Sequence, residues 1–339
     1  MVKSCRTILM IPCLIMLVTA CSKSDGGNKE SLPPEIDDEG RRRVDRMAIL
    51  GDSLATGVLN DTTIGQEVGF TFSGKVILNK QTAFDANLND LQAGRDLPRT
   101  INNVQEIYKE RPSAYYGGID MPDDAWSHAY RLGLTSGQVI NFATVAHHTT
   151  HVIEEQLPVL EANADDADYV VLQVGANDFC SSNITTDGFI DGFRDRMAQI
   201  IARLAALEEH PVVLVMPIVD VPRVMDITAG RDALWTDLIS TTMEVSCDLF
   251  QLYYCPGENL LPDAQWRELR RQMNNITLDL VTSADDPAGT RFVWAGEISS
   301  WEAFSAEDLA IDCFHPAAGI LETMSGIGFD AVRSHLQVP

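Results

Sequence analysis

Short apolar runs alternate with longer amphipathic stretches along most of the chain after residue 46. The runs predict strands at residues 47–51, 139–143, 169–174, 212–218 and 291–295. Helical spacing of apolar positions predicts helices at residues 152–162, 189–207, 233–250, 264–281 and 316–336. Strands that are apolar at nearly every position are typical of a sheet buried on both faces. The alternation therefore predicts an α/β fold, a doubly wound (flavodoxin-like) parallel sheet of five strands with helices on both faces.

The first 20 residues have a different pattern from the rest of the chain. Lys3 and Arg6 precede an apolar segment at residues 8–20, which is short for a membrane span and typical of a secretory signal peptide. It ends in Val18-Thr19-Ala20-Cys21, which resembles the lipobox of bacterial lipoproteins. The resemblance implies that residues 1–20 are removed and that Cys21 is lipidated. An ordinary signal peptide beside a coincidental cysteine is the alternative.

The segment after Cys21 is polar and contains paired glycines and paired prolines, so residues 21–45 are expected to be a lipidated, flexible tether. Acyl chains anchor a protein to a membrane and do not span it. Ser22, by resemblance to Gram-negative lipoproteins, favours the outer membrane. The expected location is therefore the bacterial cell envelope, with a lipid anchor in the outer membrane.

Charge narrows the choice of partners. The 339 residues include 25 Lys and Arg against 49 Asp and Glu, which gives a net charge of -24. Nucleic acid is excluded as a partner, because phosphate binding needs a basic face. The acidity does not identify a substrate.

The cysteines suggest disulfides. Of seven, Cys5 and Cys13 leave with the signal peptide and Cys21 carries lipid. Four cysteines remain, and an even number of cysteines in an exported protein predicts disulfides. Two disulfides are expected, and three pairings stay open. Their spacing does not match a structural zinc site. These four residues are Cys180, Cys247, Cys255 and Cys313.

Three polar segments follow predicted strands: Gly51-Asp52-Ser53, Gly175–Asp178 and Asp312–His315. Carboxyl ends of parallel strands lie at one edge of the sheet, so we expect the three segments to meet there. A long irregular stretch after the first of them predicts an insertion at about residues 55–134 within a domain at 46–339.

Each segment offers a group with a distinct chemical task. Ser53 is a candidate nucleophile, and His315 can take its proton and return it. Asp312, three residues earlier, can hold the other ring nitrogen of the histidine. An oxyanion hole needs donors in a fixed position, which the side chain of Asn177 and the backbone N–H of Ser53 can supply.

These segments resemble the SGNH (GDSL) hydrolase superfamily in content and order. Gly51–Leu54 matches its first block, Gly175–Asp178 its third and Asp312–His315 its last. The resemblance implies an SGNH-type fold and a serine ester hydrolase with the catalytic residues Ser53, Asp312 and His315. It implies no metal and no organic cofactor.

The second block of the family supplies a glycine N–H to the oxyanion hole. Here it reads Asn141-Phe-Ala-Thr-Val-Ala146, with alanine in place of the glycine. A backbone donor survives this change if the local dihedral angles suit a residue with a Cβ. We expect Ala146 to donate from an unstrained conformation, which completes an oxyanion hole of Ser53, Ala146 and Asn177.

Two further stretches, "GANDFC" at 175–180 and "DCFHP" at 312–316, resemble the phospholipase B-like and lysophospholipase-like branch. This implies a lipid carboxylic ester, such as a lysophospholipid, as substrate. An O-acetyl ester on a glycan is the alternative substrate, and a non-catalytic surface-binding lipoprotein is the alternative class. A disulfide between Cys180 and Cys313 would join the two loops, whereas two buried thiols would not.

A histidine cluster, His147-His148-Thr149-Thr150-His151, could suggest a metal site. Zinc hydrolase motifs place a glutamate between the histidines on a helix, and none is present. We expect no metal, and interpret these histidines as residues at the rim of the site.

Overall fold

The computed structural model describes residues 36–56, 127–144, 146–163, 167–236, 242–286, 289–296, 305–309, 313–316 and 318–339. All of them belong to one compact unit, Pro33–Pro339. The expected signal peptide, the lipidated Cys21 and most of the expected insertion lie outside the described residues. No helix in the described part of the chain is long and apolar enough to cross a membrane.

The last part of the expected tether belongs to the folded domain. Arg42 is 5% exposed, and its guanidinium donates to the carbonyl of Glu209. Its backbone also pairs with the C-terminal segment at His335 and Gln337. Backbone pairing therefore carries the folded unit back to Ile36, ahead of the expected start at residue 46.

The central sheet has the predicted topology. It consists of β1 (Met47–Gly51), β2 (Val139–Asn141), β3 (Tyr169–Gln173), β4 (Val212–Val215) and β7 (Arg291–Trp294). The order is β2-β1-β3-β4-β7 and every pair is parallel. Every residue of β1, β3 and β4 is buried, as expected for strands covered on both faces. The doubly wound α/β fold is confirmed.

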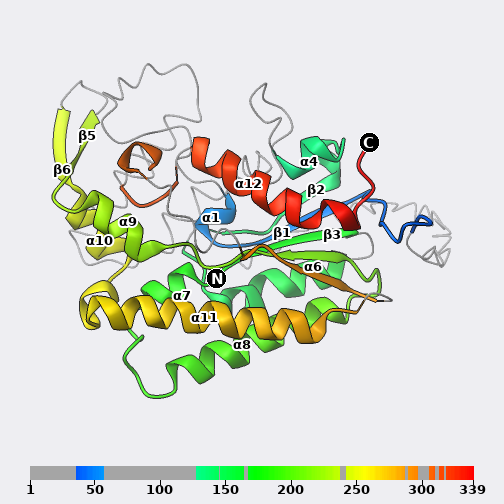
Figure 1. Cartoon of the computed structure of the whole chain (residues 1–339), viewed down its shortest axis with the longest axis horizontal. Helices are drawn as coiled ribbons and strands as arrows, with labels where there is room; N and C mark the ends of the chain where they lie inside the picture. Colours follow the sequence, from blue (N-terminus) through cyan, green and yellow to red (C-terminus); the bar gives the residue numbers. More distant parts are fainter. Residues whose placement is uncertain are drawn as a thin grey trace, which may run out of the picture. The chain divides into compact units, whose positions relative to one another are not determined.

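Helices cover both faces of this sheet (Figure 1). One face carries α12 (Ala318–Val332) and α4 (His128–Arg131), and the other carries α6 (Leu157–Asn163), α8 (Phe189–Ala205) and α11 (Asp263–Ala284). The helix α8 shows why they pack there: its apolar positions recur at helical spacing and form one buried stripe. These buried residues are Phe193, Met197, Ile200, Ile201 and Leu204.

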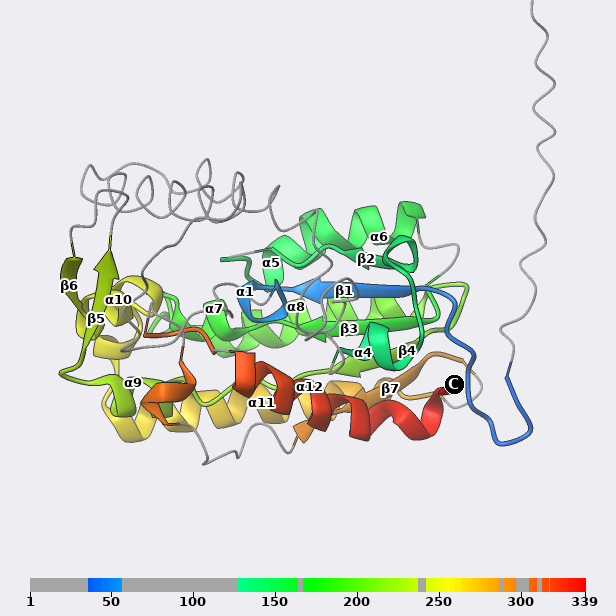
Figure 2. The ribbon, with the colours of Figure 1, turned by 90° about the horizontal axis from the view of Figure 1, so that it is seen from above.

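Smaller elements gather beyond the carboxyl ends of the strands (Figure 2). They are α1 (Ser53–Thr56), α7 (Ala176–Cys180), α9 (Val221–Thr228), α10 (Cys247–Tyr254) and the hairpin of β5 (Asp232–Thr236) and β6 (Thr242–Ser246). The remaining short helices of the described residues are α5 (Thr149–His151), the π-helix η3 (Val152–Gln156), η2 (Ser136–Gln138), η4 (Glu258–Leu260), η6 (Ala306–Asp308) and η7 (Arg333–His335).

The predicted helix at 233–250 is wrong over most of its length. Residues Asp232–Thr236 and Thr242–Ser246 instead form an antiparallel pair, and helix α10 begins only at Cys247. Short apolar segments do not distinguish helix from strand by spacing alone, so pairing between the two segments decides. The hydroxyl of Ser246 accepts from the Asp248 N–H and caps the helix that follows.

Candidate active site

The turn that carries Ser53 is built on a glycine. Gly51 ends β1 with φ +145°, and a Cβ there would lie 2.0 Å from the carbonyl oxygen of Gln173 on β3. Only glycine allows this approach of two backbones. The chain then turns through Asp52 into α1, which begins at Ser53, so the serine stands at the carboxyl edge of the sheet as predicted.

The structure brings Ser53 and His315 together. The Nε2 atom of His315 lies 2.8 Å from the Oγ atom of Ser53, across 262 residues of sequence. Both residues are buried, with 6% and 3% exposure. This is the geometry of a hydroxyl and the base that activates it. The third predicted member, Asp312, lies outside the described residues.

Aromatic contacts fix the imidazole from the side of α10. The ring of Tyr254 meets the edge of His315 at a centroid distance of 5.3 Å and stacks on Phe314 at 5.2 Å. Phe314 itself is set edge-on to His315. The histidine therefore sits among rings that limit its rotation.

The disulfides join both site loops to α10. Cys180, at the end of α7, pairs with Cys255, and Cys247 pairs with Cys313. The direct link between Cys180 and Cys313 that the sequence analysis considered is wrong. Cys247 begins α10 and Cys255 follows its last residue, so one helix connects the Asn177 segment to the His315 segment.

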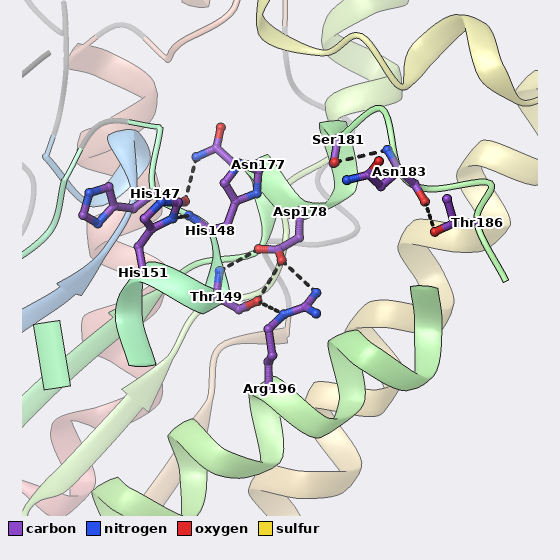
Figure 3. Close-up of polar contacts among 10 residues, drawn as sticks. All are labelled: His147, His148, Thr149, His151, Asn177, Asp178, Ser181, Asn183, Thr186 and Arg196. Atoms are coloured by element: carbon purple, nitrogen blue, oxygen red, sulfur yellow. Dashed lines mark hydrogen bonds and ion pairs between the residues drawn. The ribbon is translucent and has the colours of Figure 1, made fainter. Parts of the chain in front are cut away.

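The oxyanion candidates Asn177 and Ala146 lie on neighbouring segments. The Nδ2 atom of Asn177 donates to the carbonyl of His147 at 2.9 Å (Figure 3). Ala146 has φ +62°, in the left-handed region. The expectation of an unstrained alanine is wrong, because this conformation costs an L-residue roughly 1–2 kcal/mol relative to glycine. The glycine at this position in the family motif has no Cβ and tolerates this conformation.

Asp178 fastens these two segments to each other. Its carboxylate accepts from the backbone N–H of Thr149 at 2.8 Å and from the Thr149 hydroxyl at 2.7 Å. Arg196 completes the group, donating to Asp178 at 3.2 Å and to the Thr149 hydroxyl at 2.7 Å (Figure 3). The side chains of Asp178, Thr149 and Arg196 thus form hydrogen bonds with one another. This group stabilises the start of α5 against α7.

A second carboxylate, Asp52, has a different environment. It is fully buried beside the nucleophile, and its Oδ1 accepts from the Leu54 N–H at 3.0 Å. Burial raises the pKa of Asp52 to about 7, although the Leu54 N–H and the nearby His315 oppose that rise. Its proton therefore comes off near neutral pH.

The histidine cluster lies beside the second block of the motif. His147 and His151 stack at a centroid distance of 4.6 Å. Burial, with the neighbouring His151 and His148, lowers the pKa of His147 to about 4. Among the described residues, no group of three or more His, Cys, Asp or Glu is arranged to hold a metal ion.

Gln156 is not among the predicted site residues, yet its side chain contacts the turn that carries the nucleophile. The amide of Gln156 bonds both the N–H and the carbonyl of Gly51. A signal was present: residues 152, 156 and 160 lie on one face of a helix, where Val152 and Leu160 are apolar. A glutamine within such a stripe, here 3% exposed, indicates a specific polar contact.

A buried serine and histidine paired at the carboxyl edge of a parallel sheet define a serine hydrolase. The family model for GDSL-like lipase/acylhydrolase matches residues 47–324. The chain therefore belongs to this family and is a serine ester hydrolase.

Solved structures similar to the chain include esterase EstA from Pseudoalteromonas sp., with 11% identity, TM-score 0.38, and coverage of 85% of this chain and 97% of that one. A family 3 carbohydrate esterase from Clostridium thermocellum has 11% identity, TM-score 0.40, and coverage of 86% and 96%. A lipase/acylhydrolase from Enterococcus faecalis has 13% identity and a TM-score of 0.40, with coverage of 87% of this chain and 98% of that one. No curated protein matches the sequence. Family membership rests on the family model alone.

The two disulfides should differ in their effect on activity. Replacing Cys247 and Cys313 together by serine, or Cys180 and Cys255 together, opens loops of 66 and 75 residues and should lower the free energy of unfolding by about 2–5 kcal/mol in each case. Loss of the Cys247–Cys313 disulfide should lower kcat more than loss of the other one, because Cys313 is two residues from His315. Denaturant unfolding and ester kinetics measure both. Equal kcat in the two double variants would contradict the prediction.

The raised pKa of Asp52 should make stability depend on pH. From its ordinary value of 3.8 up to about 7, the folded protein holds one proton more than the unfolded chain. The free energy of unfolding therefore falls as pH rises through this window, by up to about 1.4 kcal/mol per pH unit. Asp52→Asn should remove this fall, measured by chemical unfolding between pH 4 and 8. Asp191→Asn, on the exposed side of α8, is the control, and a profile unchanged by Asp52→Asn would contradict the assignment.

Proposed function

We propose that the protein hydrolyses a lipid carboxylic ester, such as a lysophospholipid, through an acyl-enzyme at Ser53. The observation that carries the proposal is the buried Ser53–His315 pair, whose flanking residues line an apolar pocket. The resemblance of residues 175–180 and 312–316 to the phospholipase B-like branch supports the same substrate class.

The reaction follows from the geometry of the pair. The Nε2 atom of His315 takes the hydroxyl proton of Ser53 as Oγ attacks the ester carbonyl. The tetrahedral intermediate collapses, the C–O bond to the alcohol breaks, and the imidazolium returns the proton to the leaving oxygen. Water, deprotonated by the same histidine, then attacks the acyl carbonyl. The bond to Oγ breaks, the imidazolium returns its proton to Ser53, and the acid leaves. Asp312 is proposed to orient the ring.

The developing negative charge needs donors already in place. We assign this task to the backbone N–H groups of Ser53 and Ala146 and to the side chain of Asn177. The amide of Asn177 has two N–H donors, and the one bonded to the His147 carbonyl holds the group in position. The second is assigned to the oxyanion.

A small apolar pocket beside the pair, with room for about one water molecule, is proposed as the place where an acyl chain begins to bind. Its walls come from residues in or next to the three site segments and α9, and none of their side chains is polar. Each methylene buried in such a site contributes about 0.8 kcal/mol, or about fourfold in kcat/KM. The lining residues are Leu54, Ala176, Val219, Val221, Val224, Phe314 and Pro316.

A panel of p-nitrophenyl esters of graded acyl length, with a lysophospholipid and an acetylated glycan, tests the proposal. The value of kcat/KM should rise from acetate to longer acyl chains, and Val224→Phe should reduce this gain while leaving the acetate rate unchanged. Ser53→Ala, the control for the site, should abolish hydrolysis and fluorophosphonate labelling without unfolding the protein. Labelling at another serine would contradict the assignment of Ser53 as the nucleophile. A preference for acetate and the glycan would favour an O-acetyl esterase.

We also propose that Cys21 carries the lipid that anchors the enzyme in the outer membrane of a bacterial envelope. The support is the sequence Val18-Thr19-Ala20-Cys21 followed by Ser22. Covalent acyl chains are the only anchor in this proposal.

Substituting Cys21→Ser in the full chain should move the protein from the membrane to the soluble fraction while its esterase activity per molecule is unchanged. Fractionation at high salt, with immunoblotting and activity measured on each fraction, follows both properties. Cys5→Ser, within the signal peptide, is the matched control and should leave the protein in the membrane. A Cys21→Ser variant that still sediments with membranes would contradict lipid anchoring.

A further inference from the structure

We propose that Gln156 is a positioning residue for the nucleophile, because its side-chain amide bonds both the N–H and the carbonyl of Gly51 at the end of β1. The inference rests on the proposed role of Ser53. Gln156 is the last residue of the π-helix η3, an insertion into a helix that is often found at functional sites.

Strand β2 is shorter than β1. It ends at Asn141, which is in register with Ile49, whereas β1 continues to Gly51. The chain after β2 still follows β1, because the Phe142 N–H donates to the Ile49 carbonyl and the Thr144 N–H donates to the Gly51 carbonyl. The amide of Gln156 adds a second pair of bonds at Gly51. Its Oε1 accepts from the Gly51 N–H at 2.9 Å, and its Nε2 donates to the Gly51 carbonyl at 2.8 Å.

Backbone hydrogen bonds to the segment after β2 and to β3 also hold Gly51 and Asp52. The carbonyl of Gly51 also accepts from the N–H of Thr144 at 3.1 Å, and the following Asp52 N–H donates to Gln173 on β3 at 3.1 Å. The dihedral angles of Gly51 decide where the next two residues go, and glycine itself imposes little restriction on them. The Gln156 amide supplies that restriction two residues before Ser53.

A third contact connects this turn to the other oxyanion donors. The Nε2 atom of Gln156 lies 3.1 Å from Nδ1 of His147. His147 follows Ala146, and its carbonyl accepts from the side chain of Asn177. One buried amide thus touches the segment that carries Ser53 and the segment that carries Ala146, so it sets their relative position.

The test compares two substitutions of different chemistry. Gln156→Met keeps the length of the side chain and loses both bonds to Gly51, whereas Gln156→Glu keeps the acceptor and loses the donor at neutral pH. A displacement of about 1 Å at a reacting centre can cost about 100-fold in rate. We expect kcat to fall about 100-fold in Gln156→Met and about tenfold in Gln156→Glu, with KM changed less than about twofold.

Gln138→Met is a matched control. Gln138 also donates to a backbone carbonyl next to β1, at Asp45, but at the opposite end of the strand. Its kcat should equal that of the wild type. For every variant the rate of fluorophosphonate labelling at Ser53 is measured beside kcat and KM, with circular dichroism and thermal unfolding as the check on folding.

The outcomes separate this inference from the proposed function. A kcat within twofold of the wild type in both folded Gln156 variants would overturn it, and so would a rise in KM with kcat unchanged. Failure of both variants to fold would assign Gln156 to domain stability and overturn the positioning role. Retained activity in Ser53→Ala would instead contradict the proposed function, whatever Gln156 does.

Discussion

The close approach of Gly51 to the carbonyl of Gln173 is the constraint on which the site depends. No side chain fits between β1 and β3 there, since a Cβ would lie 2.0 Å from that oxygen. The backbone therefore leaves the sheet at this residue with φ +145° and brings Ser53 to the carboxyl edge. A parallel sheet brings its other carboxyl ends to the same edge, so Asn177 after β3 needs only a short turn to join it.

His315 depends on a different kind of support, because in the described part of the chain no strand stands immediately before its segment. Its segment is joined to α10 by the Cys247–Cys313 disulfide, and its ring is packed against Tyr254 of the same helix. The Cys180–Cys255 disulfide joins α7 to the other end of α10. Disulfides of this kind persist in oxidising compartments. The sheet thus positions the nucleophile, and α10 positions the base.

The parts that could be predicted from the sequence are those with local signals. Five apolar runs predicted five strands, and the Gly-Asp-Ser and Asp-x-x-His segments predicted the pair at Ser53 and His315. The hairpin within residues 232–246 could not be predicted, because strand pairing is a tertiary property. The disulfide pairing depends on where α10 lies, and the role of Gln156 depends on where η3 lies against the end of β1. Neither fact is local to the residues concerned.

Ala146 shows how such long-range contacts maintain a local conformation that its own residue type disfavours. A left-handed alanine persists only where its surroundings determine the backbone on both sides. On the C-terminal side, the His147 carbonyl is held by Asn177, and Thr149 is held by Asp178 through two hydrogen bonds. On the N-terminal side, Thr144 N–H is bonded to Gly51. Each of these bonds leads to a segment at the same edge of the sheet. The strain at Ala146 is therefore offset by the contacts that assemble the site, and the backbone retains the conformation that glycine would adopt most readily.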